Sequence, residues 1–156
     1  PDPAVSQAAL ETAVDLPGRA AFDVLKRALQ HGTTETFLVV VPALGRLGRV
    51  EAVDDLADLL HRTDQVELQR ECALALGRIG AATAVGALER VLFPRFLSRA
   101  YHDDVRAAAA WALARVNDNR EVERILRRAL DDKCERVQLN AKQYFDRRSR
   151  TRSGPS

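Results

Sequence analysis

Apolar residues recur along this chain with the spacing of a helix, in blocks that themselves repeat. Leu76 follows Leu44 by 32 residues, and Leu113 follows Leu76 by 37. Before each leucine, apolar side chains lie three or four positions apart, which places them on one face of a helix. A second helical set begins nine residues after each leucine, at Val53, Val85 and Val122. The spacing in each unit therefore predicts two helices. The turn that joins them is so short that the helices must pack antiparallel.

A five-residue motif marks the end of the first helix in each unit. Residues 44–48 read Leu-Gly-Arg-Leu-Gly, residues 76–80 read Leu-Gly-Arg-Ile-Gly, and residues 113–117 are a looser third copy. We expect Gly48 and Gly80 to end their helices with a positive φ, with Asn117 in the same place in the third unit. Five aspartates stand before the first helices as candidate N-caps. They are Asp64, Asp103 or Asp104, and Asp131 or Asp132.

The repeat predicts one domain over residues 1–148, because each unit must bury its apolar face on its neighbours. We divide it into a partial unit 1–33, full units 34–64, 65–102 and 103–131, and a half unit 132–148. Residues 149–156 have nothing to bury, and we expect a disordered basic tail there. The chain contains no methionine and starts in mid-pattern, so we expect it to be a fragment of a larger protein.

Residues 68–80 and 104–115 carry a family resemblance. Both segments resemble the first helix of a HEAT repeat, and the short period resembles the compact HEAT-like repeats of phycobilisome lyase subunits. The resemblance covers about residues 18 to 146. It implies an all-α, right-handed α-solenoid of antiparallel helix pairs, HEAT/armadillo-like. It says little about activity, because such repeats occur in scaffolds, regulators and a few enzymes.

Composition and the cysteines indicate the general class of the protein and its cellular compartment. Hydrophobic residues make up 46% and charged residues 29%, as in an ordinary folded chain, and the net charge of +2 does not by itself argue for nucleic acid. Cys72 and Cys134 are isolated, so we interpret both as structural thiols in a reducing compartment. No apolar run approaches the roughly 18 residues that span a bilayer, and no signal-peptide pattern opens the chain. We expect a cytoplasmic protein without membrane contact.

No converging set of catalytic or metal-ligating residues stands out. His31, His61 and His102 fall in different units, each near a loop or a helix end, and we interpret them as solvated loop histidines. We therefore expect no enzymatic activity, no metal and no cofactor. Trp111 lies within an alanine run and is expected to pack in the core or between repeats.

One departure from the repeat is an insertion. Eight residues separate Leu60 from Leu68, but thirteen separate Leu92 from Val105. The extra residues fall in segment 93–102, which holds three of the eight aromatic residues, and aromatic and arginine side chains dominate binding hot spots. Our candidate partner-binding residues in this loop are Arg95, Phe96, Arg99 and Tyr101. The alternative is that Phe93 and Leu97 only extend the second helix and cover the core.

The other departure is a drift of charge along the second helices. Positions one, two and five after each repeated valine should face outward, and in HEAT-type arrays this row lines the concave face. The row carries Asp54, Asp55 and Asp58 in the first full unit, Gly86, Ala87 and Arg90 in the second, and Glu123, Arg124 and Arg127 in the third. Our candidate partner-binding residues on this face are Asp54, Asp55, Asp58, Arg90, Arg124 and Arg127. The charge of the row passes from acidic to basic, which suits a partner whose charge is similarly polarised. Ordinary solvated faces are the alternative.

The favoured function is a non-catalytic protein–protein interaction scaffold or regulatory module. It would bind a protein or peptide, including other domains of its parent chain, on the concave face and the 93–102 loop. A nucleic-acid-binding domain is the first alternative, suggested by the arginine-rich C-terminal third, but the acidic residues 54–58 would repel a phosphate backbone. A lyase-type cofactor-handling subunit is the second alternative.

Overall fold

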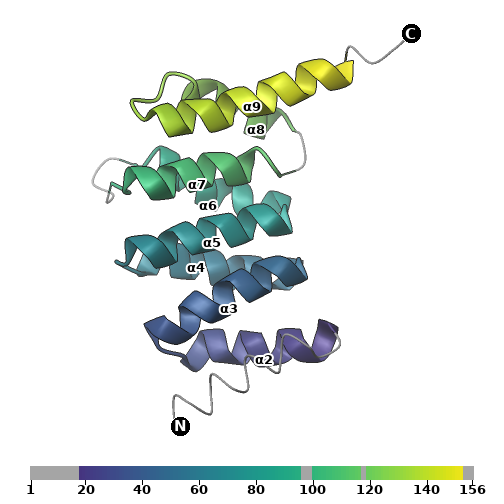
Figure 1. Cartoon of the computed structure of the whole chain (residues 1–156), viewed down its shortest axis with the longest axis vertical. Coiled ribbons are helices and arrows are strands. Elements are labelled where there is room, and N and C mark those ends of the chain that lie inside the picture. Colours follow the sequence, from purple (N-terminus) through teal and green to yellow (C-terminus); the bar gives the residue numbers. More distant parts are fainter. Residues whose placement is uncertain (1–17, 96–99, 117–118, 153–156) are drawn as a thin grey trace.

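The computed structural model describes residues 18–95, 100–116 and 119–152, which hold helices and no strand. Figure 1 shows the helices stacked into an elongated column of two layers. The first helices of the units form one layer: α3 (Thr34–Leu47), α5 (Val66–Ile79), α7 (Asp103–Leu113) and α9 (Glu135–Arg152). Behind them lie α4 (Val53–Arg62), α6 (Val85–Leu92) and α8 (Arg120–Ala129). The prediction of an all-α solenoid of antiparallel helix pairs is confirmed.

Contacts between neighbouring units hold the stack together. In the first layer α3 packs on α5, α5 on α7, and α7 on α9, while each second helix packs on the first helix of the next unit. The repeated apolar positions are buried throughout, including Leu44, Leu76 and Leu113, which are completely buried. The core is therefore continuous along the column, as stacked repeats require.

The second helices begin with a short turn of 3₁₀ helix in two units. These turns are η1 (Val50–Ala52) before α4 and η2 (Ala82–Ala84) before α6. Gly48 and Gly80 precede them with φ of 66° and 68°, and each donates its N–H to the carbonyl four residues earlier. Both glycines are the predicted left-handed helix ends. Asn117, predicted for the same role, lies outside the described residues.

The first helices begin differently from the prediction. Thr33 caps α3 with its hydroxyl, the N-cap position of α5 is Gln65 rather than Asp64, and His102 caps α7 by accepting a hydrogen bond from the Asp104 N–H at 3.2 Å. Asp103 and Asp104 instead lie in the first turn of α7, where carboxylates favour the helix dipole. Asp132 accepts the Cys134 N–H at 2.8 Å just before α9. The aspartate caps predicted for α5 and α7 are therefore wrong.

The two ends of the column are also helical. At one end α2 (Gly18–His31) buries Phe22, Leu25 and Leu29, as the partial first unit predicts. At the other end α9 continues to Arg152, four residues into the segment 149–156 for which the sequence predicts disorder. The prediction is wrong for residues 149–152, and 153–156 lie outside the described residues. No helix in the described part of the chain combines the length and the apolar character needed to cross a membrane.

Candidate partner-binding surface

The charged row on the second helices faces solvent, as its spacing predicts. Asp54 and Asp58 on α4, Arg90 on α6, and Arg124 and Arg127 on α8 are all exposed. Asp55 is half-buried, and its carboxylate lies 3.4 Å from the Lys26 ammonium of α2. The row is therefore a surface that α4, α6 and α8 present together.

The two ends of the row differ in how far their charges are already paired. Arg124 forms an ion pair with Glu89 of α6 at 2.8 Å, and Arg127 pairs with Glu123 of its own helix at 2.7 Å. Asp54 and Asp58 form no ion pair with another described residue. The basic end is thus largely neutralised within the chain, whereas the acidic end on α4 keeps its charge.

A hollow of about 580 Å³ lies over the basic end of the row. It is lined by Arg120, Glu123, Arg124, Arg127, Arg128 and Asp131. All six lining residues are charged, four of them arginines and two acidic, and such a surface suits polar contacts with a partner.

The two ends of the 93–102 loop are anchored on the column. Phe93 is half-buried against the core, and the Arg128 guanidinium lies 3.9 Å from the centre of its ring. At the far end the half-buried Tyr101 places its hydroxyl 2.6 Å from Nδ1 of His61 on α4. Arg95 is exposed between these anchors. The candidates Phe96 and Arg99 lie outside the described residues.

His61 is not the solvated loop histidine that the sequence suggests. Its ring is half-buried, and its Nε2 atom is buried without a hydrogen-bond partner among the described residues. Burial lowers the pKa of His61, and the nearby positive charge of Arg90 lowers it further, while Asp58 acts in the opposite direction. His31 and His102 are exposed, as expected.

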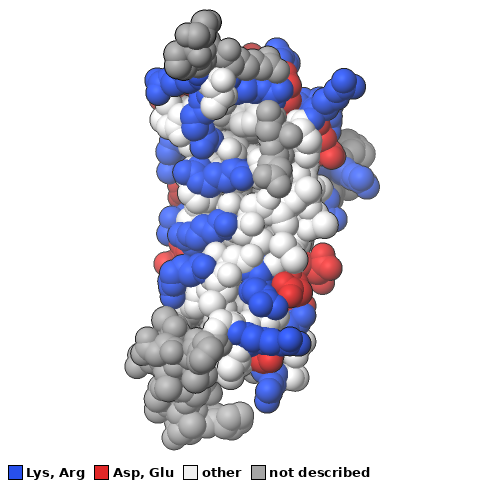
Figure 2. All heavy atoms as spheres, turned by 90° about the vertical axis from the view of Figure 1, so that its right-hand side faces the viewer, with Lys and Arg blue, Asp and Glu red and all other residues white. Residues whose placement is uncertain are grey.

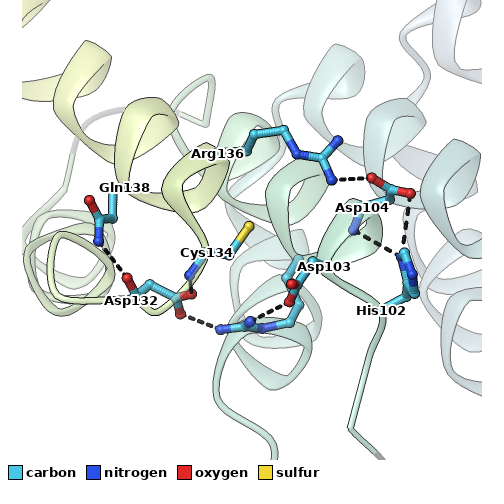
Figure 3. Close-up of polar contacts among 8 residues, drawn as sticks. His102, Asp103, Asp104, Asp132, Cys134, Arg136 and Gln138 are labelled. Atoms are coloured by element: carbon cyan, nitrogen blue, oxygen red, sulfur yellow. Dashed lines mark hydrogen bonds and ion pairs between the residues drawn. The ribbon is translucent and has the colours of Figure 1, made fainter.

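A cluster of buried polar groups joins the N-terminal ends of α7 and α9, and sequence reasoning missed it. Arg106 of α7 is almost buried and donates to Asp103 at 2.9 Å and to the buried carboxylate of Asp132. Figure 3 shows how Asp132 in turn receives the Cys134 N–H and how its backbone carbonyl accepts from Gln138 at 2.6 Å. These bonds connect the third unit to the half unit that follows it.

A second part of the same cluster is exposed. Arg136 of α9 pairs with Asp104 of α7, and Asp104 also lies 3.4 Å from the His102 ring (Figure 3). The hydrogen bond from Arg136 lowers the pKa of Asp104 and raises that of Arg136 itself. Both groups therefore stay charged across the neutral range.

We call this cluster the clasp, and the polar position at its centre recurs along the chain. Gln69, Arg106 and Gln138 occupy the same position of successive first helices, seven residues before Leu76, Leu113 and Phe145. Gln69 donates to the Thr63 carbonyl at 2.8 Å, just as Gln138 donates to that of Asp132. The signal in the sequence is a polar residue on an otherwise apolar helix face.

No group in the described residues is arranged for metal binding or thiol chemistry. The described residues contain no group of three or more histidine, cysteine or acidic side chains that could hold a metal ion. Cys72 and Cys134 are both buried and free. Burial raises the pKa of the Cys72 thiol, and the charge of Glu71 adds to this, so the thiol stays protonated.

Comparison with known protein families agrees with this architecture. The model described as the PBS lyase HEAT-like repeat matches residues 68–93 and 105–132. The first match covers the helix pair α5 and α6, and the second covers α7 and α8. The match is to these two units, and it confirms the resemblance to HEAT-like repeats seen in the sequence. A comparison with curated proteins gives no match.

Proposed function

We propose that this chain is a non-catalytic scaffold or regulatory module that recognises a protein or peptide partner. The partner-binding surface comprises the charged row on α4, α6 and α8 together with the loop 93–102. The observation that carries the proposal is the charge of Asp54 and Asp58, which are exposed at outward positions of α4 and form no ion pair with another described residue. The solenoid supplies a rigid frame, and the row supplies the chemistry of recognition.

The pairing within the row indicates the charge of the partner. Asp54 and Asp58 offer carboxylates without an ion-pair partner among the described residues, whereas Arg124 and Arg127 are already held by Glu89 and Glu123. A partner with lysine or arginine side chains opposite α4 gains new ion pairs there. A partner opposite α8 must first compete with the existing pairs.

The same pairing weighs against nucleic acid on this face. Two of the α8 arginines that suggested phosphate binding, Arg124 and Arg127, already pair with glutamates, and the acidic α4 lies in the same row. A lyase-type cofactor-handling role remains the second alternative, with which the family match is compatible. The hollow over α8 gives it little support, because charged side chains line it on every side. The buried free thiols support a reducing compartment such as the cytoplasm.

Affinity capture with the immobilised chain tests the proposal. Proteins retained by the wild type are compared with those retained by the double variant Asp54→Lys with Asp58→Lys. The matched control is Glu35→Lys with Glu67→Lys, which also changes exposed acidic groups in the first turns of helices. We expect the α4 variant to lose the partner and the control to keep it. Equal recovery by both variants would contradict the proposal.

The loop is tested by changing Arg95, Phe96 and Arg99 together to alanine. We expect weaker partner binding with unchanged helical content by circular dichroism. If the same partners are recovered at the same salt tolerance, the loop has no part in recognition.

A further inference from the structure

One arginine recurs at the same repeat position in the three full units and the half unit, toward the C-terminal end of the first helix. Arg46, Arg78, Arg115 and Arg147 each lie two residues after the repeated apolar position occupied by Leu44, Leu76, Leu113 and Phe145, and all four are exposed. We call them the arginine ladder. Figure 2 shows a column of Lys and Arg side chains along the edge of the stack at which the first helices end. This edge is distinct from the second-helix row.

The ladder borders a shallow open groove. Arg46, Arg78 and Arg115 line it together with Trp111 and the glycine-bearing ends of α3 and α5, and its volume is about 630 Å³. Arg147 continues the series, because its guanidinium donates to the Ala114 carbonyl at 2.8 Å, next to Arg115. Four repeat-equivalent cations therefore follow one line along the column.

The charges of the ladder are not neutralised within the described part of the chain. Arg46 and Arg78 form no hydrogen bond or ion pair with another described residue. Arg115 and Arg147 donate only to backbone carbonyls, those of Trp111, Gln143 and Ala114. Burial and the charge of Arg147 both lower the pKa of Arg115, which shows like charges held together. Arg124 and Arg127 of α8 differ, since glutamates pair with them.

The packing between repeats holds two of these arginines in place. The Arg115 guanidinium stacks on the Trp111 ring at 3.6 Å. Trp111 itself lies against Gly77 of the preceding unit, and the Arg78 side chain lies against Gly45 in the unit before that. Because glycine leaves room for each contact, Trp111 and the Arg78 side chain each rest on the preceding unit, and Arg115 rests on Trp111. A preorganised cation loses less conformational freedom when it binds an anion.

We propose that the arginine ladder binds an extended acidic peptide that carries a carboxylate at about every third residue. Packed helices lie about 8–10 Å apart, which sets the step between successive arginines. A polyproline II peptide rises about 3.1 Å per residue and repeats every three residues, so its side chains return to the same face after about 9 Å. Each carboxylate then meets one guanidinium, the pairing for which arginine is best suited.

Charge and ring geometry favour a peptide over nucleic acid at this edge. Single-stranded nucleic acid binds by stacking bases on aromatic rings. In the groove the Trp111 ring is already covered by Arg115. Carboxylates need no free ring. A simpler role for the ladder is to offset the negative C-terminal ends of the helix dipoles, and that role requires no ligand.

Fluorescence anisotropy with labelled peptides tests the proposal. One peptide carries glutamate at every third residue in a proline- and serine-rich background, and a second has the same composition with its glutamates clustered. We expect the spaced peptide to bind more tightly, and the variant Arg46→Gln with Arg78→Gln to weaken it about tenfold, a loss of about 1.4 kcal/mol. The matched control is Arg62→Gln with Lys133→Gln, which removes two exposed cations beside the other ends of the first helices and should leave binding unchanged.

Three outcomes would overturn the proposal. Equal affinity for the spaced and clustered peptides would mean that the arginine ladder does not distinguish how the carboxylates are spaced. Tighter binding of a single-stranded or duplex oligonucleotide, lost in the same double variant, would assign the edge to nucleic acid. Absence of peptide binding at low salt, with the fold intact by circular dichroism, would leave the arginines with the dipole role. The variants leave Asp54 and Asp58 intact, so this result is independent of the capture experiment.

Discussion

Gly77 of α5 faces Ala112 of α7 so closely that a Cβ atom on Gly77 would lie 2.6 Å from the Ala112 Cα atom. Gly45 meets Ala75 in the same way one unit earlier, where the distance would be 2.9 Å. These neighbours are backbone atoms, which cannot swing aside. The first glycine of the repeated motif therefore sets how closely the units stack, and the second ends the helix.

Replacing Gly77 with alanine is expected to lower the free energy of unfolding by about 1–3 kcal/mol, because the added methyl group overpacks the contact between α5 and α7. Chemical denaturation followed by circular dichroism measures the change. Gly86→Ala is the matched control, since Gly86 is exposed in α6 and a Cβ there would meet nothing within 4 Å. The control should gain about 0.5–1 kcal/mol from helix propensity. A Gly77→Ala protein as stable as the control would show that the units do not stack this closely.

The clasp between α7 and α9 predicts a large effect of one buried carboxylate. Asp132→Ala removes the buried partner of the Arg106 guanidinium and leaves only the more exposed Asp103, so the free energy of unfolding should fall by about 2–3 kcal/mol. The comparison is Arg136→Gln, which breaks the exposed pair with Asp104 and should cost no more than about 1 kcal/mol. Thermal melts of both variants measure the difference. Similar losses in the two proteins would mean that the buried ion pair stabilises the fold no more than the exposed one.

The lowered pKa of His61 predicts that acid destabilises the fold. The unfolded chain takes up a proton at His61 near its ordinary pKa of about 6.5, whereas the folded chain takes it up only at lower pH. Stability is therefore full above that pH, and it falls as the pH drops from about 6.5 toward the lowered pKa of the folded state. His61→Gln should show a smaller drop in Tm between about pH 7.5 and about pH 5.5 than the wild type. All other titrating groups are common to both proteins, so an identical drop would contradict the buried state of His61.

The sequence was sufficient to predict the helices, their pairing and the glycine ends, because these depend on local spacing and on one backbone conformation. Gly48 and Gly80 are examples, since glycine has no Cβ atom and adopts a positive φ without a steric clash. The outward direction of Asp54 and Arg127 also followed from helical spacing.

Pairings between distant residues could not be predicted in the same way. His61 and Tyr101 lie 40 residues apart, and nothing in the pattern shows that the 93–102 loop returns to α4. The extension of α9 was missed because its last turns are polar. Arg148 is held by Glu123 at 3.3 Å and by the Tyr144 hydroxyl at 2.8 Å, contacts that hydropathy does not reveal.

If the second-helix row recognises the partner, binding should cover α4 and α6. Amide hydrogen exchange is measured for the chain alone and in complex with the captured partner. We expect slower exchange in the complex for peptides from α4 and α6, at residues 53–62 and 85–92. Unchanged exchange in these helices, with protection confined to the first helices α3, α5 and α7, would contradict it.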